Sequence, residues 1–579
     1  MENKVLADIF YEIADFLDIE PTKSSKFEIM AYKKAGLTIE TLQEPIEDIY
    51  KKYGKKGLMS LPGIGSGLAD KIEEFIKTGK IKKYNEFKKK YPIDLRQLTN
   101  IEGIGARKAI LLYKKLGIRN IADLKRSIEQ NKISKLQNFG PKSQDSIKRS
   151  IELLEKSKGR ILLGVALPLA EQIVEQLKKS NLTDKIEISG SIRRMRETIG
   201  DIDILAVSNQ SKKLMDFFSE LNDVENIIVK GETKTTVWLK AGISCDLRVV
   251  KNKSFASALQ YFTGNKEHNI NIREIAISKN LKLNEYGLFD NKNKFIYCSN
   301  ENDIYEKLGM QYMPPEMRED RGEIKLAQSH KIPKLVELKD LKGDLHVHTD
   351  DSDGENSLEE MAAAAQNNKL EYIAITNHTK SLKIANGLDE KRFSNLFERI
   401  DKLNQKIQES ANKLILLKSA EVDILKNGTL DLDKKTLDQM DCVIGAVHSY
   451  FKMEKNEMTS RIIKAIESSN INILAHPTGR LINERPGYLL DIEKIFEACE
   501  KNNVILEINS FPNRLDLNDT NILLASKYNV MFSIDTDSHR AEHLKFLKYG
   551  TGTARRGWLA KEKIINSKSL DQLKQIFKK

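Results

Sequence analysis

The sequence is poor in the residues that build disulfide frameworks and zinc ribbons. Its 579 residues include only four cysteines, Cys245, Cys298, Cys442 and Cys499, and no two of them form a Cys-x-x-Cys pair. This usage fits a reducing compartment. No apolar run approaches the roughly 20 residues that cross a bilayer, and the N-terminus lacks a basic segment followed by an apolar one. We therefore expect a cytoplasmic protein with no membrane partner.

The excess charge of the chain is positive and lies toward the N-terminus. The formal net charge is +12, and residues 341–579 contain equal numbers of basic and acidic side chains. The whole excess therefore lies in residues 1–340, most of it in residues 1–160. A positively charged N-terminal part beside a C-terminal part without net charge favours a polyanionic partner at the N-terminal end. Charge alone also fits a solubilising surface. Length predicts about three or four domains.

The stretch from Gly190 to Asp203 joins a glycine turn, a serine, an arginine pair and two carboxylates. Asp201 and Asp203 are spaced i, i+2 on an apolar strand, so their side chains share one face and repel unless a cation lies between them. Mg²⁺ suits such a pair because it prefers a few carboxylates together with substrate phosphates. We expect Ser191, Arg194 and the N–H groups near Gly190 to contact the other phosphates of a nucleotide. The alternative is a solvated turn that carries these residue types by accident.

This stretch resembles the nucleotidyltransferase motif of family X DNA polymerases, the group that includes DNA polymerase beta. The resemblance is carried by GSIRR, by GDID and by the later strands KGETKTTVWL and SCDLRVV. It implies that Asp246 is a third metal-binding carboxylate beside Asp201 and Asp203, and that together they hold Mg²⁺. It further implies a template-directed polymerase that uses dNTPs to fill short gaps in base excision or end-joining repair. Gapped or nicked double-stranded DNA would be its partner, and the protein would be nucleoid-associated.

The segment YFTGNKEHN, from Tyr261 to Asn269, resembles the part of these polymerases that lies along the incoming sugar and base. The resemblance implies that Tyr261 and Phe262 exclude a ribose 2′-hydroxyl. It also places Gly264 in the nucleotide pocket and Asn269 at the minor-groove edge of the new base pair. Relatives have a serine at the position of Asn265, so the fit of this turn stays open.

Three glycine turns in the basic N-terminal region each open a helix. They are LPGIGSGLA at 61–69, IEGIGARKAI at 101–110 and LQNFGPKSQDSI at 136–147. N–H groups at such a helix start accept a phosphate without reading a base. The turns resemble helix-hairpin-helix motifs. The DNA-binding residues that this resemblance implies are Gly63, Gly65, Gly103, Gly105, Gly140 and Lys142.

The first turn and its surroundings resemble the lyase domain of DNA polymerase beta. Aligned on the glycines, the Schiff-base lysine of that family falls on Lys71, where nearby cations would lower the amine pKa and permit attack on an abasic-site aldehyde. Gly67 stands where relatives have a basic residue. Two roles therefore stay open for Lys71, a catalytic one in a lyase and a plain phosphate contact.

The C-terminal half alternates apolar runs with helical segments, which predicts a parallel barrel whose site lies at the strand C-termini. The seven runs are GDLHVHT, YIAITNH, ILLKSAEVDIL, CVIGAVHS, INILAHP, VILEINS and VMFSIDTDSH. Six of the nine histidines of the chain lie at or just after these strand ends. The metal ligands that we expect are His346, His348, Asp353, His378, Glu421, His448, His476, Asp537 and His539. Nitrogen and oxygen ligands without cysteine favour up to three Mn²⁺, Zn²⁺ or Fe²⁺ ions and the hydrolysis of a phosphoester.

This half resembles the PHP (polymerase and histidinol phosphatase) domain. The resemblance implies a Mn²⁺-dependent 3′→5′ exonuclease and incision at abasic sites. Asn377 stands where relatives have an aspartate, a change that we expect to weaken or retune one metal. Arg480, Arg514 and Arg540 are candidate phosphate clamps.

We therefore predict a multidomain monomer with an α-helical helix-hairpin-helix N-terminal region, an α+β nucleotidyltransferase palm and thumb, and a C-terminal distorted (β/α)7 PHP barrel. The expected parts are a lyase-like DNA-binding domain (1–92), a helix-hairpin-helix domain (93–158), the palm (159–250), the thumb (251–325), a linker (326–340) and the barrel (341–579). Two alternatives stay open. One is a DNA-end binding scaffold with polymerase activity and a purely structural barrel, which an unfilled metal position would favour. The other is a nucleotidyltransferase fused to a small-molecule phosphatase, against which the helix-hairpin-helix turns and the positively charged N-terminal part weigh.

Overall fold

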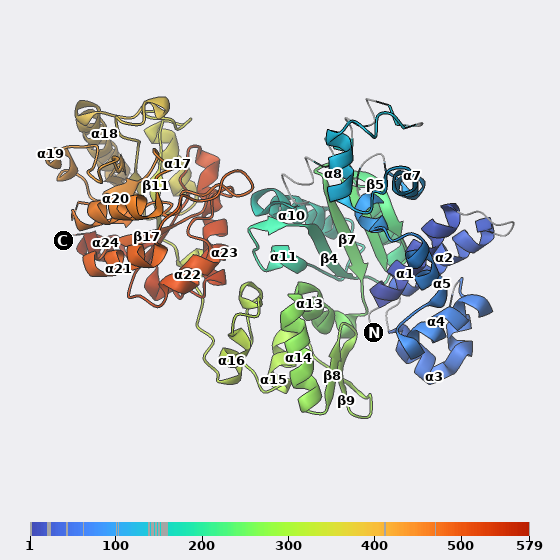
Figure 1. The fold of residues 1–579 in the computed structure, drawn as a ribbon. Helices are drawn as coiled ribbons and strands as arrows, with labels where there is room; N and C mark the ends of the chain where they lie inside the picture. Colours follow the sequence, from blue (N-terminus) through green and yellow to red (C-terminus); the bar gives the residue numbers. More distant parts are fainter. Residues whose placement is uncertain are drawn as a thin grey trace.

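The computed structural model describes residues 3–19, 25–41, 45–61, 63–99, 101, 104–136, 139–140, 144, 147–148, 151, 160–409, 413–468 and 470–577. The chain runs from an N-terminal group of helices through a central mixed sheet and a helical lobe to a C-terminal barrel (Figure 1). Among these residues no helix is both long enough and apolar enough to cross a membrane.

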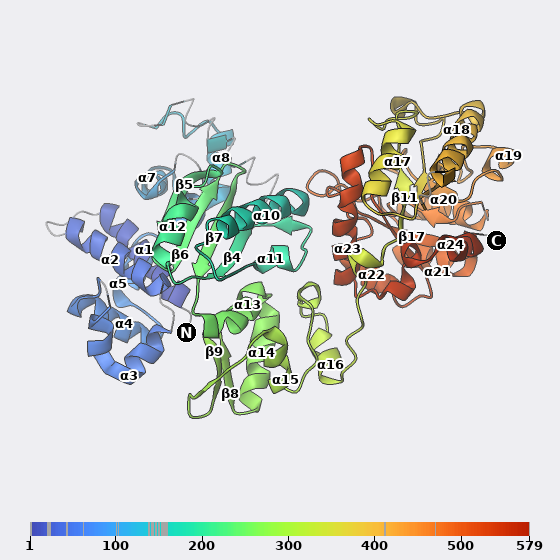
Figure 2. The same ribbon diagram turned by 180° about the vertical axis from the view of Figure 1, so that it is seen from behind.

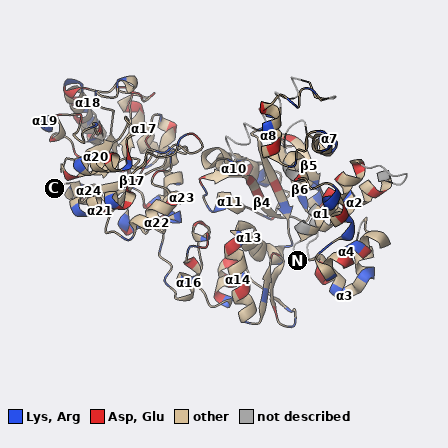
Figure 3. Ribbon diagram, in the orientation of Figure 1, with Lys and Arg blue, Asp and Glu red and all other residues tan. Residues whose placement is uncertain are grey.

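The N-terminal region is helical, as its apolar spacing of three and four residues predicts. In α1, for example, Leu6, Phe10 and Ile13 are fully buried. Lysines dominate α5, which Figure 3 shows mostly in blue. The helices are α1 (Asn3–Ile19), α2 (Ser25–Thr41), α3 (Ile46–Met59), α4 (Ser66–Thr78), α5 (Lys82–Lys90), α6 (Leu95–Thr99), α7 (Ala106–Leu116) and α8 (Ile121–Glu129).

A five-stranded sheet with the strand order β2-β4-β7-β6-β5 forms the centre of the molecule. Only β4 and β7 are parallel neighbours; the other pairs are antiparallel. Apolar residues of β4, β6 and β7 pack against α10 and α12, which cover one face of the sheet (Figure 2). The elements are β1 (Ile161–Leu162), α10 (Leu163–Lys179), β2 (Lys185–Ile188), α11 (Gly190–Arg193), β3 (Thr198–Ile199), β4 (Asp201–Val207), α12 (Ser211–Ser219), β5 (Val224–Lys230), β6 (Lys234–Leu239) and β7 (Ile243–Val249).

A lobe of helices and a small antiparallel sheet, β10-β9-β8, follows the central sheet. This lobe contacts the N-terminal helices. Asn3 Nδ2 donates to the Tyr286 hydroxyl at 3.2 Å, and Lys282 Nζ lies 3.2 Å from Asp48 Oδ2. The elements are η1 (Asn252–Ser254), α13 (Phe255–Thr263), α14 (Lys266–Ser278), β8 (Leu281–Asn284), β9 (Gly287–Asp290), β10 (Phe295–Ile296), α15 (Glu301–Lys307), η2 (Pro315–Met317), α16 (Glu323–Gln328) and η3 (Leu338–Asp340).

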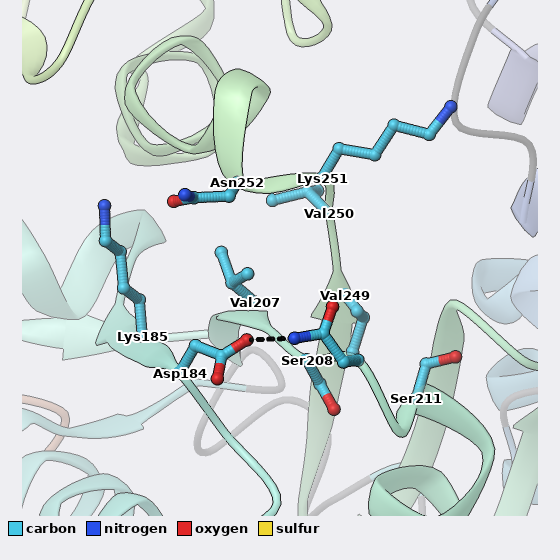
Figure 4. Close-up of a pocket in the computed structure, with 10 residues that line it drawn as sticks. Asp184, Lys185, Val207, Ser208, Ser211, Val249, Val250, Lys251 and Asn252 are labelled. Atoms are coloured by element: carbon cyan, nitrogen blue, oxygen red, sulfur yellow. Dashed lines mark hydrogen bonds between the residues drawn. The ribbon is translucent and has the colours of Figure 1, made fainter.

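A cavity of about 390 Å³ lies where the central sheet meets this lobe (Figure 4). Its wall includes Val207 at the end of β4, Asn252, and Asp184, which accepts a hydrogen bond from Asn209 Nδ2 at 3.2 Å. Asp201 opens the same strand at its other end. The cavity is therefore separate from the carboxylates of the nucleotidyltransferase motif.

The C-terminal half forms a closed parallel barrel. Its sheets, β11-β12-β13 and β14-β15-β16-β17-β18, are parallel throughout and are joined by bridges from Val347 to Ser538 and from His378 to Glu421. The run ILLKSAEVDIL is interrupted after Lys418 and gives both β13 and β14. The predicted distorted seven-stranded barrel is confirmed, with this one strand broken in two.

Helices surround these strands (Figures 1 and 2). The strands are β11 (Gly343–Val347), β12 (Tyr372–Ile375), β13 (Ile415–Lys418), β14 (Glu421–Asp423), β15 (Ile444–Ala446), β16 (Ile473–Leu474), β17 (Ile505–Asn509) and β18 (Phe532–Asp535). The helices are α17 (Leu358–Asn367), η4 (Lys383–Ala385), α18 (Glu390–Glu409), α19 (Lys434–Leu437), α20 (Lys455–Glu467), α21 (Ile492–Asn502), α22 (Asp519–Ala525), η5 (Ala541–Phe546), α23 (Leu547–Arg556), η6 (Lys561–Lys563), η7 (Ile565–Ser567) and α24 (Leu570–Phe577).

Ion pairs connect the barrel to the other half of the chain, which contains the central sheet and the lobe. They join Lys548 to Glu171 at 3.1 Å, Arg480 to Glu197 at 2.7 Å and Arg555 to Glu316 at 2.7 Å. The side of the barrel that carries α22 and α23 faces the central sheet (Figure 2). The two halves are therefore in direct contact in addition to being linked by the chain.

Candidate active sites

Three aspartates occupy two adjacent parallel strands of the central sheet. The register places Asp203 of β4 opposite Asp246 of β7, and Asp201 opposite Ser244. Because alternate residues of a strand share a face, all three carboxylates lie on one side of the sheet. In the described part of the chain, groups of three ligand atoms within 4.8 Å of one another occur in the barrel and not in this sheet. Asp246 here lies 3.3 Å from Lys234 Nζ, a cation that offsets its charge.

Gly190 lets the turn before β4 lie directly against Asp203. Its φ is 63°, and a Cβ at this position would lie 2.3 Å from Asp203 Oδ2. The N–H of Ser189 donates to the Asp203 carbonyl at 2.8 Å and fixes the start of α11 beside the carboxylates. Ser191 Oγ is buried and finds no hydrogen-bond partner among the described residues. A hydroxyl left in this way beside an aspartate cluster suits the phosphate contact expected of Ser191.

Both arginines of the motif are held by acids of the lobe. Arg193 Nη2 donates to Glu301 Oε2 at 2.5 Å. Arg194 Nε donates to Glu319 Oε1 at 3.0 Å, and Arg194 Nη1 donates to the Thr263 carbonyl. The phosphate contact expected of Arg194 would therefore compete with Glu319 for this guanidinium.

Asn265, the one departure from the expected YFTG segment, lies directly before α14. Its side chain accepts a hydrogen bond from the His268 N–H at 2.8 Å and caps α14. Serine and asparagine are both favoured helix caps, so this departure keeps the local geometry. Gly264 has a φ of 69°, and a Cβ there would lie 3.2 Å from Arg194 Nη1. The turn and the motif arginine are thus in contact, as the predicted nucleotide pocket requires.

Asn269 bonds to the preceding helix in this structure, and its expected contact with the base pair stays a prediction. This residue is 8% exposed and its amide is already bonded: Nδ2 donates to the Tyr261 carbonyl at 2.7 Å, and Oδ1 accepts from Gln260 Nε2 at 2.9 Å. In this conformation Asn269 fixes the end of α13 and does not present its amide to a base pair. Phe262 packs with Arg248, whose guanidinium lies 4.7 Å from the ring centroid, and its expected place beside the sugar stays a prediction.

The three glycine turns of the N-terminal region share two backbone hydrogen bonds among their described residues. In each turn a buried residue donates its N–H to the carbonyl three residues earlier, and the exposed glycine that follows accepts from the N–H four residues later. The buried residues are Ile64, Ile104 and Phe139, with bonds of 3.1, 3.0 and 3.0 Å, and the glycines are Gly65, Gly105 and Gly140, with bonds of 2.9, 2.9 and 3.1 Å. This common pattern confirms the predicted repeat.

The first two turns present open helix N-termini. A Cβ at Gly65 or at Gly105 would meet nothing within 4 Å, so a phosphate can approach both. Gly63 has a φ of 80° and packs against the Lys34 side chain. Gly103 and Lys142, which were also expected to bind DNA, lie outside the described residues.

Lys71 lies half-buried in α4, the helix that Gly65 opens. The adjacent Asp70 pairs with Lys55. Among the described residues no partner is found for the Lys71 amino group. Both roles considered for Lys71 stay predictions.

The expected barrel ligands converge in one place. Three groups have ligand atoms within 4.8 Å of one another: His348, Asp353, His378 and His539; His346, His348 and Asp537; and His378, Glu421 and His448. His348 and His378 each belong to two groups, so the groups form one continuous cluster. His476 stands beside it, with Nε2 2.8 Å from Glu421 Oε1.

Several polar atoms of this cluster are buried and have no hydrogen-bond partner among the described residues. They are His346 Nε2, His348 Nδ1 and Nε2, His378 Nδ1, Glu421 Oε2, His448 Nδ1 and His476 Nδ1. Buried polar atoms are normally satisfied, and so many unbonded atoms around one point fit a set of metal ligands.

The pKa values of the cluster differ from one histidine to the next. At His378 and His448 burial lowers the pKa, but nearby carboxylates, Glu421 above all, outweigh it and raise the pKa to about 9, so these imidazoles must lose a proton when a metal binds. Burial, together with the His539 and His378 rings, lowers the pKa of His348 to about 3. Burial alone would raise the pKa of Glu421, but the surrounding imidazoles outweigh it and hold that pKa well below its ordinary value. A neutral imidazole and an ionised carboxylate are the forms that bind a metal.

Glu507 contacts two of the expected metal ligands, although the sequence motifs do not identify it. It lies within β17, and its Oε1 is 2.6 Å from His346 Nδ1, while its Oε2 accepts the N–H of His476 at 2.6 Å. Through these contacts it fixes two expected ligands, as carboxylates behind metal-bound histidines do. The only signal in the sequence is an acid inside the apolar strand VILEIN.

Asn377 contacts the loop before Asp353 and not a metal ligand. Its Oδ1 accepts from the Thr349 N–H and from Ser352 Oγ, both at 2.8 Å, and its Nδ2 donates to Thr349 Oγ1 at 2.8 Å. An amide both donates and accepts here, which a carboxylate cannot do. The residue therefore acts on the position of Asp353 through the loop.

Of the three expected phosphate clamps, only Arg514 lies at the cluster, with Nε 3.4 Å from Asp537 Oδ2. The Arg480 guanidinium pairs with Glu197 of the other half, and its expected role as a phosphate clamp stays a prediction. Arg540 pairs with Glu355 at the surface.

Comparison with known proteins agrees with this arrangement. Residues 1–81 match the helix-hairpin-helix domain family, residues 95–152 the SAM-like helix-hairpin-helix tandem, residues 258–319 the DNA polymerase beta thumb and residues 344–511 the PHP domain. The chain is 34% identical over 582 residues to the DNA polymerase/3′-5′ exonuclease PolX of Bacillus subtilis (strain 168), with 100% of both chains covered. The chain belongs to the family X DNA polymerases that carry a C-terminal PHP domain.

More distant relatives cover part of the chain. DNA polymerase lambda of Rattus norvegicus is 23% identical over 327 residues, which are 51% of this chain and 53% of that protein. DNA nucleotidylexotransferase of Xenopus laevis is 22% identical over 367 residues, which are 54% of this chain and 68% of that protein.

Proposed function

We propose that this chain is a template-directed DNA polymerase that fills short gaps during repair, and that its barrel removes nucleotides from 3′ ends. The observation that carries the proposal is the pair Asp203 and Asp246, opposite each other on parallel strands beside the turn at Gly190. The full-length relative whose name states both activities supports it.

The carboxylates of Asp201, Asp203 and Asp246 would hold Mg²⁺ in the palm, and the barrel ligands would hold up to three Mn²⁺, Zn²⁺ or Fe²⁺ ions. When bound, such cations neutralise phosphate charge and lower the pKa of the attacking hydroxyl or water. Ser191 donates its hydroxyl to a phosphate of the dNTP, and Arg194 turns from Glu319 to the same triphosphate. In the barrel, Arg514 contacts the phosphate that is cleaved, and Glu507 keeps His346 in place.

The N-terminal turns would hold the DNA without regard to sequence. The open N–H groups after Gly65 and Gly105 suit a phosphate, and a terminal 5′-phosphate carries more charge than a phosphodiester. We therefore infer a preference for gaps that end in a 5′-phosphate. Affinity should fall steeply with salt, since several phosphate contacts release counterions.

Primer extension on a duplex with a one-nucleotide gap tests the proposal. The wild type should add one templated nucleotide in Mg²⁺, and Asp203→Ala should lose about a thousandfold or more in rate. Asp216→Ala is the matched control, because Asp216 is a surface acid of the same domain that pairs with Lys230. Extension by Asp203→Ala at the rate of the control would refute the assignment.

A second candidate activity is the cleavage of abasic sites, by Lys71 as a lyase or by the barrel as an endonuclease. The position of Lys71 behind the first glycine turn favours the lyase. Borohydride should trap the wild type on DNA with a 5′-deoxyribose phosphate and leave Lys71→Ala untrapped. Trapping that is unchanged in Lys71→Ala would assign the phosphate-contact role to this lysine, and incision that persists there but not in His348→Ala would place the activity in the barrel.

A further inference from the structure

A barrel arginine reaches into the nucleotidyltransferase motif. Arg556 ends α23 and is 4% exposed. Its Nη1 donates to the Arg194 carbonyl at 2.7 Å and to Glu319 Oε1 at 2.9 Å, and its Nη2 donates to Asp519 Oδ2 at 2.5 Å. One buried side chain of the barrel thus holds both the main chain of Arg194 and the acid that pairs with the Arg194 side chain.

Glu319 is shared among three arginines. Its Oε1 accepts from Arg194 Nε at 3.0 Å and from Arg556, and its Oε2 accepts from Arg196 Nη1 at 3.2 Å. Burial raises the pKa of Glu319, but Arg556 and the other arginines outweigh it and keep that pKa below its ordinary value. The carboxylate is therefore charged at neutral pH and needs cationic partners, since an unpaired buried charge is strongly unfavourable.

The close approach of the two halves is built into the sequence of α23. Gly552 lies one turn before Arg556, and a Cβ at this position would lie 2.5 Å from Met195 Cε. The absence of a side chain at Gly552 lets α23 pack against the residue that follows Arg194. Asp519 in turn binds both Arg556 and Arg321, with Nη2 of Arg321 3.1 Å away. Asp519 thus holds the guanidinium of Arg556 within the barrel, and the same guanidinium also contacts the motif.

We propose that Arg556 is a positioning residue of the polymerase site, so that the barrel takes part in nucleotide binding. This inference rests on the proposed role of Arg194 as a triphosphate contact. A nucleotide that binds Arg194 competes with Glu319 for its guanidinium, and Arg556 keeps Glu319 compensated when Arg194 turns to the triphosphate. Without Arg556, Glu319 would have fewer cationic partners. It would then bind Arg194 more tightly and compete more strongly with the nucleotide for this arginine. The bond to the Arg194 carbonyl also keeps α11 in place.

Steady-state kinetics of the full chain on a one-nucleotide gap test this inference. Arg556→Ala should raise the KM for dNTP about tenfold with a smaller change in kcat, because a charge-assisted buried contact is lost. Arg556→Lys should restore part of the affinity. Lys548→Ala is the matched control: it removes an ion pair with Glu171 from the same interface without touching the motif, and its KM should equal that of the wild type. Exonuclease without dNTPs should be unchanged in all three variants.

A second variant, Glu319→Gln, should change the KM for dNTP in the opposite direction. Glu319→Gln removes the charge that competes with the nucleotide for Arg194, so its KM for dNTP should fall below that of the wild type. In the double variant the loss caused by Arg556→Ala should largely disappear, which a double-mutant cycle measures as coupling.

The inference is overturned if Arg556→Ala keeps the wild-type KM. It is also overturned if Arg556→Ala lowers extension, exonuclease and melting temperature together, because Arg556 then serves only the fold. Arg194→Ala tests the proposed role of Arg194 separately from the role of Arg556. If Arg194→Ala leaves the KM for dNTP unchanged, the proposed role of Arg194 fails; if it raises the KM while Arg556→Ala does not, only the inference about Arg556 fails.

Discussion

Gly190 and Asp203 are packed so closely that a side chain at the glycine would displace the carboxylate. A Cβ at Gly190 would lie 2.3 Å from Asp203 Oδ2, and the φ of 63° at this glycine already disfavours any side chain. The turn that would receive the triphosphate therefore lies directly against the carboxylate that would hold Mg²⁺. A substitution at Gly190 would therefore displace the Asp203 carboxylate.

Gly190→Ala should lose extension far more than stability. Its alanine would push the Asp203 carboxylate aside, and a displacement of about 1 Å in an active site can reduce a rate about a hundredfold. Gly242→Ala is the matched control: its φ is 78° but a Cβ there meets nothing within 4 Å. Both variants should lose about 1–3 kcal/mol of unfolding free energy from backbone strain. Equal extension rates in the two variants, measured beside their melting temperatures, would refute the coupling.

Gly105→Glu should weaken DNA binding without unfolding the N-terminal region. Gly105 caps α7 with a φ of −87°, and a side chain there has open space. A carboxylate at a helix N-terminus interacts favourably with the helix dipole, yet it repels a phosphate that approaches the same N–H groups. Titration of gapped DNA at two salt concentrations measures the effect. Unchanged affinity together with an unchanged salt dependence would show that this turn does not contact phosphate.

Glu507→Gln should weaken metal binding in the barrel. The carboxylate fixes His346 at 2.6 Å, and loss of such a partner reduces metal affinity about 10–100-fold. Metal content after dialysis against a weak chelator reports this independently of activity. Glu493→Gln is the control, since Glu493 lies on the outer helix α21 and accepts from the Tyr528 hydroxyl. Retention of metal by Glu507→Gln at the level of the control would contradict the role assigned to Glu507.

The ion pairs of Glu301 should make stability fall in acid. Burial raises the pKa of Glu301, but Arg318 and Arg193 outweigh it and lower that pKa from 4.5 to about 2. A lowered pKa stabilises the fold above pH 4.5, and this contribution is lost as the pH falls toward 2. The advantage of the wild type over Glu301→Gln in unfolding free energy should shrink by about 3 kcal/mol over that interval. Denaturant unfolding at pH 7, 4 and 2.5 measures it, and an advantage independent of pH would contradict this origin.

The sequence predicts the parts of both sites that are local in the chain. Asp201 and Asp203 lie two residues apart on a strand, and the paired glycine turns repeat at Gly65 and Gly105, so short motifs define them. The barrel ligands are spread over about 190 residues, yet each follows an apolar run, and the C-terminal ends of parallel strands meet at one place.

Contacts between distant segments could not be predicted in the same way. Glu507 meets His346 across 161 residues and Arg556 meets Glu319 across 237 residues, and neither pair has a spacing that a motif can specify. Arg480 has the residue type of a phosphate clamp, but the packing of the two halves gives it Glu197 as a partner. Asn269 is likewise taken up by α13, the helix that precedes it.

We propose that polymerisation and exonuclease activity belong to separate sites, one with Asp203 and one with His348. The most direct measurement is a crossed pair of assays on a gapped duplex with a labelled primer, extension with dNTPs and degradation without them. We expect Asp203→Ala to lose extension and keep degradation, and His348→Ala to lose degradation and keep extension, because the metal ligands of the two sites are not shared. If His348→Ala still degrades the 3′ end while Asp203→Ala does not, the nuclease lies in the palm and the claim is wrong.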